Sequence, residues 1–292
     1  MRNMRLVARF LVGVCFVVAG CIGCLAAQDL SASFNAIFNQ HEFDAKRFGP
    51  ARWIDGGTRY TTVEPSAAVS GGQDIVEYET ATGNRTVLVS AAKLVAKPGA
   101  PPMKIDDYAW SSDNKQLLVF TNTKKVWRLN TRGDYWVLDL ASGNLKKLGG
   151  DAPESSLMFA KFSPDGKSVA FVRANNIYVQ DLATDQIRQL TQDGSPTLID
   201  GTSDWVSEEE LSLRDAFRWS PSSQWIAYWQ FDTTGVGQYS LINDTKQEYP
   251  AVTTYPYPQP GTTNSAVKIG VVSAQGGPTK WMQLPGGPAI TT

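Results

Sequence analysis

The 292-residue sequence predicts an all-β protein of the β-propeller class. Three observations support this prediction. After Trp53, short strand-like runs alternate with Gly, Asn and Asp turns to the end of the chain, without a long helical period. Two sequence phrases recur, and each combines a strand-like run with a tight turn. The first phrase returns after 52 and then 57 residues, close to the spacing of propeller blades, which is about 40 to 50 residues.

The first phrase is an aromatic residue, a turn of the Ser-Pro-Asp-Gly type and an apolar run, and it occupies residues 110–120, 162–171 and 219–228. The second is an alternating strand that ends in an acidic residue and a small-residue turn, at residues 75–83, 135–143 and 177–185. A blade is a small sheet that cannot bury both faces alone, so blades occur in series. At about 50 residues a blade, the chain after Trp53 provides four to five of them.

Residues 1–27 are predicted to be a targeting segment, because a basic start precedes an apolar run that ends in small residues. Two processing routes compete: signal-peptide cleavage after Ala27, or lipoprotein processing that lipidates Cys21 and keeps the chain on the membrane. Either route predicts export to the periplasm or the cell exterior. All three cysteines lie within this segment, so cleavage after Ala27 would leave no thiol for catalysis, disulfides or metal binding.

Residues 28–51 form a polar lead-in with scattered aromatic residues, for which we expect one short helix. His41, the only histidine of the chain, lies in this segment. The propeller portion is expected to begin at Arg52 and to continue to Thr292.

The composition is that of an ordinary globular protein, with 42% hydrophobic and 19% charged residues. The formal net charge is −1, and without residues 1–27, which hold three arginines and no acids, it becomes 24 − 28 = −4. We therefore expect no nucleic-acid partner, and a cationic partner fits better than an anionic one.

The irregular spacing of the first phrase predicts insertions between blade elements. One lies between Thr191 and Phe217 and contains an acidic turn. The second is the Pro- and Tyr-rich run Tyr249–Gly261, which we interpret as an extended loop with packed aromatic side chains.

The acidic turn has the sequence Asp-Trp-Val-Ser-Glu-Glu-Glu-Leu over residues 204–211. Ser207 and Glu210 have the spacing of a capping box, which predicts a helix start and puts Glu208, Glu209 and Glu210 in its first turn. The helix dipole favours acids at that end. One interpretation is a solvated helix cap. The other is a cation site, in which neighbouring carboxylates bind an ammonium group and Trp205 and other apolar neighbours fix the turn.

Hydrolytic chemistry within this chain finds little support. A Ser-His-Asp triad needs a suitably placed histidine, and His41 is in the lead-in. No Gly-x-Ser-x-Gly elbow or zinc-ligand spacing occurs, so we predict no metal and no cofactor. Arg128, in a strand-like stretch, offers a planar donor group for a carbonyl or carboxylate, although a lone arginine is more often only solvated.

The sequence resembles the N-terminal propeller of the dipeptidyl peptidase IV family of serine peptidases from about Arg52 to its C-terminus. The most specific part is the acidic turn, which is similar to the family motif D-W-V-Y-x-E-E, with Ser207 in place of the usual tyrosine. Further family-like segments occur in the family's order: residues 126–128 before the acidic turn, and residues 219–221, 227–228, 255–258, 261, 264 and 267–268 after it.

The resemblance implies that Glu209 and Glu210 hold the free α-amine of a peptide, and that Arg128 contacts the carbonyl between its first two residues. Asp204, Trp205 and Glu208 would support this site.

The resemblance also implies an eight-bladed ring in the full-length protein, a homodimer of that form, and an α/β-hydrolase domain with the catalytic residues, which this sequence lacks. The chain alone is thus expected to gate and bind substrate without cleaving it. A free-standing propeller-like binding protein of the periplasm is the main alternative. A related oligopeptidase fits less well, because an amine clamp has no role in internal cleavage.

Overall fold

The structure, a computed structural model, describes residues 30–45, 48–245 and 247–283. The chain divides into two compact units, Met1–Gly49 and Pro50–Thr292. The predicted targeting segment, including Cys21 and the cleavage site after Ala27, lies outside the described residues. In the part that is described, no helix has the length and apolar character that a membrane crossing requires.

The described part of the first unit contains the short helix that we expected in the lead-in. Residues 30–34 are α-helical and continue into a π-helical turn, η1 (Asn35–Asn39). Phe34 and Phe38 stack with ring centroids 5.4 Å apart, yet η1 buries none of its residues. His41 pairs with Asp44 through Nδ1 and Oδ2 at 3.2 Å, and both side chains are exposed.

The described part of the second unit consists almost entirely of β-strands, and its strand pairs are antiparallel, which confirms the all-β part of the predicted fold class. A four-stranded sheet contains β1 (Ala51–Ile54), β2 (Arg59–Pro65), β3 (Gln73–Glu79) and β4 (Arg85–Val89). An eight-stranded sheet contains β5 (Asp107–Trp110), β6 (Gln116–Lys124), β7 (Arg132–Asp139), β8 (Leu145–Lys147), β9 (Leu157–Phe162), β10 (Ser168–Arg173), β11 (Asn176–Asp181) and β12 (Ile187–Gln189). A five-stranded sheet contains β13 (Leu198–Asp200), β14 (Phe217–Trp219), β15 (Trp225–Asp232), β18 (Ala266–Ser273) and β19 (Lys280–Trp281). The hairpin of β16 (Gln238–Asn243) and β17 (Ala251–Pro256) completes the set, and the helical turns are η2 (Asp55–Gly57), η3 (Ala91–Lys93) and α2 (Trp205–Glu209).

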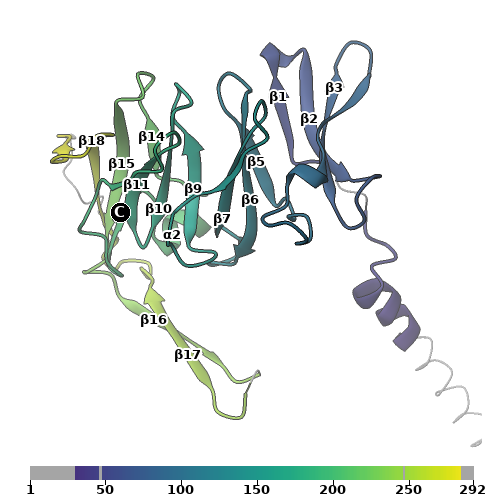
Figure 1. The fold of residues 1–292 in the computed structure, drawn as a ribbon. Coiled ribbons are helices and arrows are strands. Elements are labelled where there is room, and N and C mark those ends of the chain that lie inside the picture. Colours follow the sequence, from purple (N-terminus) through teal and green to yellow (C-terminus); the bar gives the residue numbers. More distant parts are fainter. Residues whose placement is uncertain (1–29, 46–47, 246, 284–292) are drawn as a thin grey trace, which may run out of the picture. The chain divides into compact units, whose positions relative to one another are not determined.

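The eight-stranded sheet consists of two successive meanders, β5–β8 and β9–β12. They join where β7 pairs with β9 at two positions, Arg132 with Met158 and Gly133 with Leu157. The sheets of the second unit stand side by side along the sequence in Figure 1. This succession of small antiparallel sheets is the propeller-like arrangement that the repeated phrases predicted.

The aromatic-turn-strand phrase connects β5 to β6, β9 to β10 and β14 to β15. In the middle copy the Ser163 hydroxyl donates to Asp165 Oδ1 at 2.6 Å, and Asp165 accepts from the Lys167 backbone N–H. Gly166 takes the left-handed conformation at φ 71° and donates its N–H to the Ser163 carbonyl. These hydrogen bonds lie within residues 163–167, so the turn could be predicted from the local sequence alone.

The hydrophobic core lies largely between successive meanders. One cluster joins β3 and β4 to β5–β7 through residues such as Ile75, Val89 and Leu117. Another joins β10 and β11 to β14, β15 and β18, with Phe217 and Tyr228 fully or almost fully buried. Since each sheet buries one face against its neighbour, single sheets are not expected to be stable alone.

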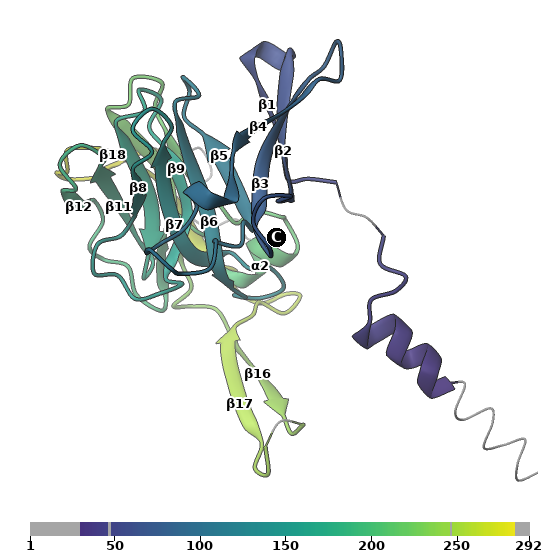
Figure 2. The same ribbon diagram turned by 45° about the vertical axis from the view of Figure 1, so that its right-hand side comes forward.

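The hairpin β16–β17 corrects one prediction. The run Tyr249–Gly261 was expected to be an extended loop, whereas its first part forms β17, paired with β16 from Gln238–Pro256 to Asn243–Ala251. The hairpin projects from the five-stranded sheet in both views (Figures 1 and 2). Every residue of β16 is exposed. The prolines misled the prediction, because Pro250 precedes the strand and Pro256 is its last residue, so neither interrupts its pairing.

Gly201, between β13 and α2, lies where the fold leaves no room for a side chain. It has φ 76°, and a Cβ at this position would lie 2.8 Å from Ile177 Cγ1 and 2.9 Å from Val172 Cγ2. We expect Gly201→Ala to lower the free energy of unfolding by about 2 to 4 kcal/mol, because conformational strain adds to overpacking. Gly143→Ala is the matched control in urea denaturation, since Gly143 has φ 72° but no atom within 4 Å of such a Cβ. Equal losses for both variants would show that the crowding contributes nothing.

Candidate functional site

The acidic helix α2 is short and is capped by Asp204. Asp204 has extended backbone angles, and its Oδ1 accepts a hydrogen bond from the Ser207 N–H at 3.0 Å. Its Oδ2 accepts from the Ser265 hydroxyl, which ties the helix start to the segment before β18. The capping box starting at Ser207 is therefore wrong: an aspartate three residues earlier satisfies the amide first, and the helix begins at Trp205.

The three glutamates of the turn have different environments. Glu208 is buried, and its Oε1 lies 3.9 Å from Arg214 Nε without forming a hydrogen bond. Glu209 has a side chain that is only 5% exposed and forms an ion pair with Arg128. Glu210 is the C-cap residue and is exposed. The sequence presented three equivalent acids, whereas the fold makes Glu208 buried, Glu209 ion-paired and Glu210 exposed.

Burial raises the pKa of Glu208, and the charge of Glu209 raises it further, whereas the Arg214 guanidinium lowers it. The net direction is upward, so the Arg214 charge does not fully compensate for the loss of water around Glu208. Glu208 is thus suited to holding the helix in place, and less suited to binding a solvated cation.

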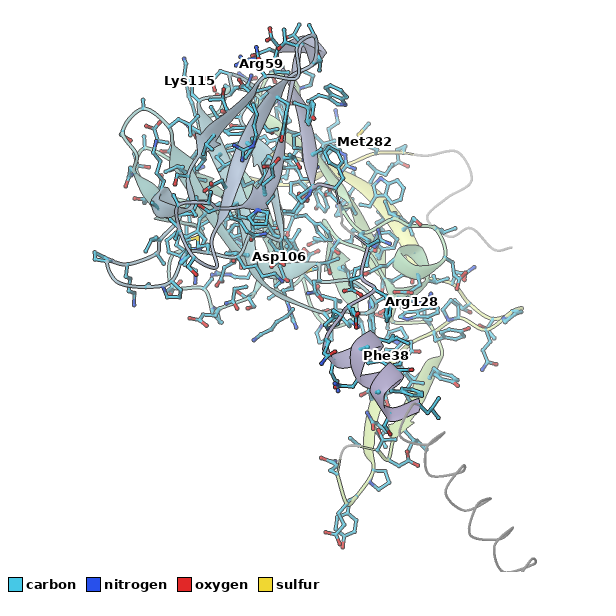
Figure 3. The ribbon with its side chains drawn as sticks, turned by 90° about the vertical axis from the view of Figure 1, so that its right-hand side faces the viewer. Phe38, Arg59, Asp106, Lys115, Arg128 and Met282 are labelled. Carbon is cyan, nitrogen blue, oxygen red and sulfur yellow. The ribbon has the colours of Figure 1, made fainter. Side chains whose placement is uncertain are left out.

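Arg128 lies in the loop between β6 and β7, which corrects its predicted place on a strand, because β6 ends at Lys124. Figure 3 labels Arg128 together with Lys115, which is in the turn at the other end of β6. The Arg128 side chain is 77% exposed, and its Nε pairs with Glu209 Oε2. It makes no hydrogen bond to any other described residue, so its terminal guanidinium nitrogens can donate to a ligand.

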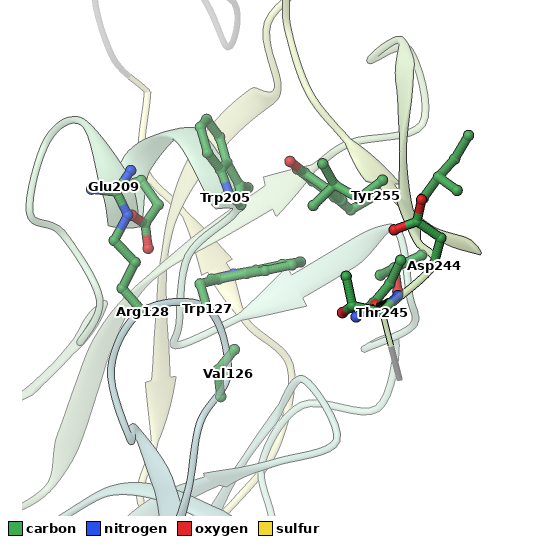
Figure 4. Close-up of a pocket in the computed structure, with 12 residues that line it drawn as sticks. Val126, Trp127, Arg128, Trp205, Glu209, Asp244, Thr245 and Tyr255 are labelled. Atoms are coloured by element: carbon green, nitrogen blue, oxygen red, sulfur yellow. Dashed lines mark hydrogen bonds and ion pairs between the residues drawn. The ribbon is translucent and has the colours of Figure 1, made fainter. Parts of the chain in front are cut away.

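The Arg128 loop, α2 and the hairpin β16–β17 surround a cavity of about 620 Å³. Figure 4 shows Arg128 and Glu209 on one side of this cavity and Asp244 and Thr245 of the hairpin on the other. Aromatic side chains line the space between them: Trp127, Trp205 and Tyr255. The cavity therefore has the Arg128–Glu209 ion pair at one end, Asp244 at the other and aromatic rings between them.

The structure brings some predicted site residues together and leaves others apart. Arg128, Trp205 and Glu209 line the cavity described above. Asp204 and Glu208 line a second cavity of about 420 Å³, which Trp205 also borders. Glu210 lines neither, although it is the exposed neighbour of Glu209 in the chain.

Two contributors were not identified from the sequence. Arg214, the charge partner of Glu208, follows the acidic turn closely, and an arginine so near three acids was a usable signal. Ser265 lies 61 residues from its partner Asp204, and no local pattern could have revealed it. Among the residues described, no group of three or more His, Cys, Asp or Glu side chains is arranged to hold a metal ion.

The fold and the site define a propeller-like, all-β domain with a cavity that is lined by a glutamate–arginine ion pair and by aromatic side chains. The family profile described as Dipeptidyl peptidase IV (DPP IV) N-terminal region matches residues 111–290, which is more than half of the chain. The chain belongs to this family.

Relatives and solved structures agree with this assignment. Dipeptidyl aminopeptidase B of Saccharomyces cerevisiae is 33% identical over 180 residues, which cover 60% of this chain and 21% of that protein. A probable dipeptidyl-aminopeptidase B of Neosartorya fischeri is 34% identical over 171 residues, or 54% of this chain and 19% of the relative. The crystal structure of Porphyromonas gingivalis dipeptidyl peptidase 4 superposes with a TM-score of 0.75 at 29% identity, covering 86% of this chain and 35% of that one. The chain thus spans about a fifth of the length of these curated relatives.

Proposed function

We propose that this chain binds the free α-amino end of a peptide at Glu209 and Glu210. In this proposal it is the substrate-gating propeller part of an exported dipeptidyl peptidase of the serine type, which releases dipeptides from peptide N-termini. The observation that carries the proposal is the Arg128–Glu209 ion pair beside the exposed Glu210, at the charged end of the cavity.

The chemistry of a peptide N-terminus fits these groups. An α-ammonium carries three N–H donors, and the carboxylates of Glu209 and Glu210 supply acceptors for them. Arg128 pairs through its Nε with one oxygen of Glu209 and lines the cavity. Its terminal nitrogens bond to no described residue, so they can donate to a peptide carbonyl. Carboxylates that hold the amine, next to an arginine that donates to the first carbonyl, fix the first residue of a peptide. This would let an enzyme count residues from that end.

The remaining parts of the proposal concern the full-length protein. We propose that the described sheets are four to five blades of an eight-bladed ring. The relatives' greater length leaves room for the other blades and for an α/β-hydrolase domain that carries the Ser, Asp and His. A homodimer of that longer form and an exported location, anchored through Cys21 or free after cleavage, complete it.

The proposal is tested by binding of the peptide Gly-Pro-Gly-Gly and of its N-acetylated form to the chain, followed by calorimetry. Acetylation removes the ammonium charge, so we expect at least tenfold weaker binding of the acetylated peptide, the equivalent of one charge-assisted hydrogen bond. Equal affinities would remove the amine site and favour a propeller-like binding protein without a substrate clamp.

The purified chain itself is expected not to hydrolyse a Gly-Pro-linked chromogenic substrate. Its only histidine, His41, is exposed and pairs with Asp44, and the sequence contains no Gly-x-Ser-x-Gly elbow. Release of the chromophore, blocked by a serine-peptidase inhibitor, would contradict this part of the proposal.

A further inference from the structure

Five aromatic rings meet where the hairpin β16–β17 joins the rest of its unit. Tyr255 is the common member, with ring centroids 5.1 Å from Trp127, 5.8 Å from Trp205, 6.1 Å from Tyr239 and 6.3 Å from Tyr257. It is 8% exposed, and it is the buried residue of a hairpin whose other strand residues are exposed or half-buried. Tyr255 therefore anchors the hairpin by its ring.

The two tryptophans that Tyr255 contacts belong to the two segments that carry the proposed substrate contacts. Trp127 immediately precedes Arg128 in the β6–β7 loop. Trp205 comes four residues before Glu209 on α2, and residues at this spacing share one face of a helix. Tyr255 thus contacts the residue next to Arg128 and the residue one helical turn before Glu209.

The Arg128 loop has few other attachments. Val126 and Thr131 donate backbone hydrogen bonds to Leu129 within the loop, and the Asn130 side chain donates to Thr123 at the end of β6. Among the described residues outside the β6–β7 segment, residues 125–130 form ion pairs, ring contacts or hydrogen bonds only with Glu209 and Tyr255. The ion pair involves an exposed arginine and is expected to be weak alone. The ring contact is therefore the better candidate for fixing the loop.

We propose that Tyr255 is a positioning residue for peptide recognition: its ring contacts Trp127 and Trp205 and holds the Arg128 loop against α2. The hairpin thereby sets the distance between the Arg128 guanidinium, which donates to the peptide carbonyl, and the glutamates, which accept from the amine. This inference rests on the proposed function of the site. It assigns to the hairpin a role in affinity for the peptide N-terminus, transmitted through Arg128 and Glu209.

The test compares binding of Gly-Pro-Gly-Gly and its N-acetylated form to variants of the full chain. We expect Tyr255→Ala to reduce the preference for the free amine roughly tenfold, a typical coupling between contacting residues. Tyr255→Phe should keep the preference, because the Tyr255 hydroxyl makes no hydrogen bond with a described residue and the ring is retained. Tyr249→Ala is the matched control, since this tyrosine is on the same hairpin, 77% exposed and without a ring contact to a described residue.

A double-variant cycle separates positioning from a general loss of structure. If Tyr255 acts through Glu209, then Glu209→Gln should reduce the preference for the free amine less in the Tyr255→Ala background than in the wild type. The two losses are then less than additive. Additive losses, or a loss in Tyr255→Phe as large as in Tyr255→Ala, would overturn the inference. If Tyr255→Ala does not fold, Tyr255→Leu takes its place, because it keeps an apolar side chain without a ring.

The proposed function and this inference fail in different ways. A wild-type chain that binds both peptides equally removes the amine site itself. A wild-type chain that prefers the free amine, loses the preference in Glu209→Gln and keeps it in a folded Tyr255→Ala variant leaves the site in place and removes only the role of Tyr255.

Discussion

Replacing Glu209 with glutamine is expected to weaken binding of Gly-Pro-Gly-Gly roughly ten- to a hundredfold, while binding of the N-acetylated peptide stays the same. The substitution keeps the size of a nearly buried side chain but removes the charge that faces Arg128. Losing one charge-assisted contact to an ammonium costs about 1.5 to 3 kcal/mol. Glu210→Gln should have an effect in the same direction, measured by the same titration.

Glu248→Gln is the control for this experiment, because Glu248 is exposed on the hairpin and does not line the cavity at Glu209. It should leave both affinities unchanged. If Glu209→Gln behaves like Glu248→Gln, the acidic turn is a helix terminus without a binding role, and the family membership stands without the proposed mechanism.

Asp200→Asn is expected to stabilise the chain at pH 8 by up to about 4 kcal/mol, and by little at pH 4. Asp200 is completely buried, its Oδ1 accepts from Gln230 Nε2 at 2.9 Å, and its Oδ2 has no hydrogen-bond partner in the described part of the chain. The same Gln230 nitrogen donates to Asp193 at 2.9 Å, so two carboxylates share one donor. Burial raises the pKa of Asp200 to about 7, and the charge of Asp193 adds to this.

The sign follows from proton binding. Between about pH 4 and pH 7, folded Asp200 keeps a proton that the unfolded chain has released, so the free energy of unfolding falls as pH rises through this window. Asparagine does not titrate, so the advantage of Asp200→Asn should grow over the same window. Denaturant titrations at several pH values measure it. A pH-independent difference would mean that Asp200 has an ordinary pKa.

Asp181→Asn provides a control of opposite sign. Hydrogen bonds from the backbone and side chain of Thr184 hold the pKa of Asp181 below its usual value. Its carboxylate therefore contributes stability at neutral pH that is lost as pH falls through the lowered pKa. This variant should be less stable than the wild type at pH 8, and the difference should close in acid.

Local sequence carried most of the fold. The turn around Asp165 and Gly166 is shaped by hydrogen bonds within residues 163–167, and the strand that follows contains the apolar run Val169–Val172. Such elements depend on neighbours in the chain, so the β class and the repeated meanders could be predicted. Pro256 suggested a loop, but it is the last residue of β17, and this strand pairs with β16 in a regular register.

The site was less predictable, because its geometry depends on distant partners. The motif located the acidic turn, but the burial of Glu208 depends on the surrounding fold and its charge partner Arg214 was missed. The loop position of Arg128 puts it next to Glu209, which is 81 positions away in the sequence. Asp200 gave no signal at all, since an aspartate in a turn-rich sequence is ordinarily solvated.

The register of the five-stranded sheet has a further consequence for how this domain tolerates change. Strands β15 and β18 pair without a shift from Trp225–Ser273 to Asp232–Ala266, although the whole hairpin lies between them in the sequence. Residues 233–265 are therefore an insertion between two paired strands, and its two ends are held side by side by the pairing of Asp232 with Ala266. Variation in the length or sequence of this insertion therefore need not disturb the pairing of the two strands, and the segment offers a natural exchange point for altering the hairpin while the sheet is retained.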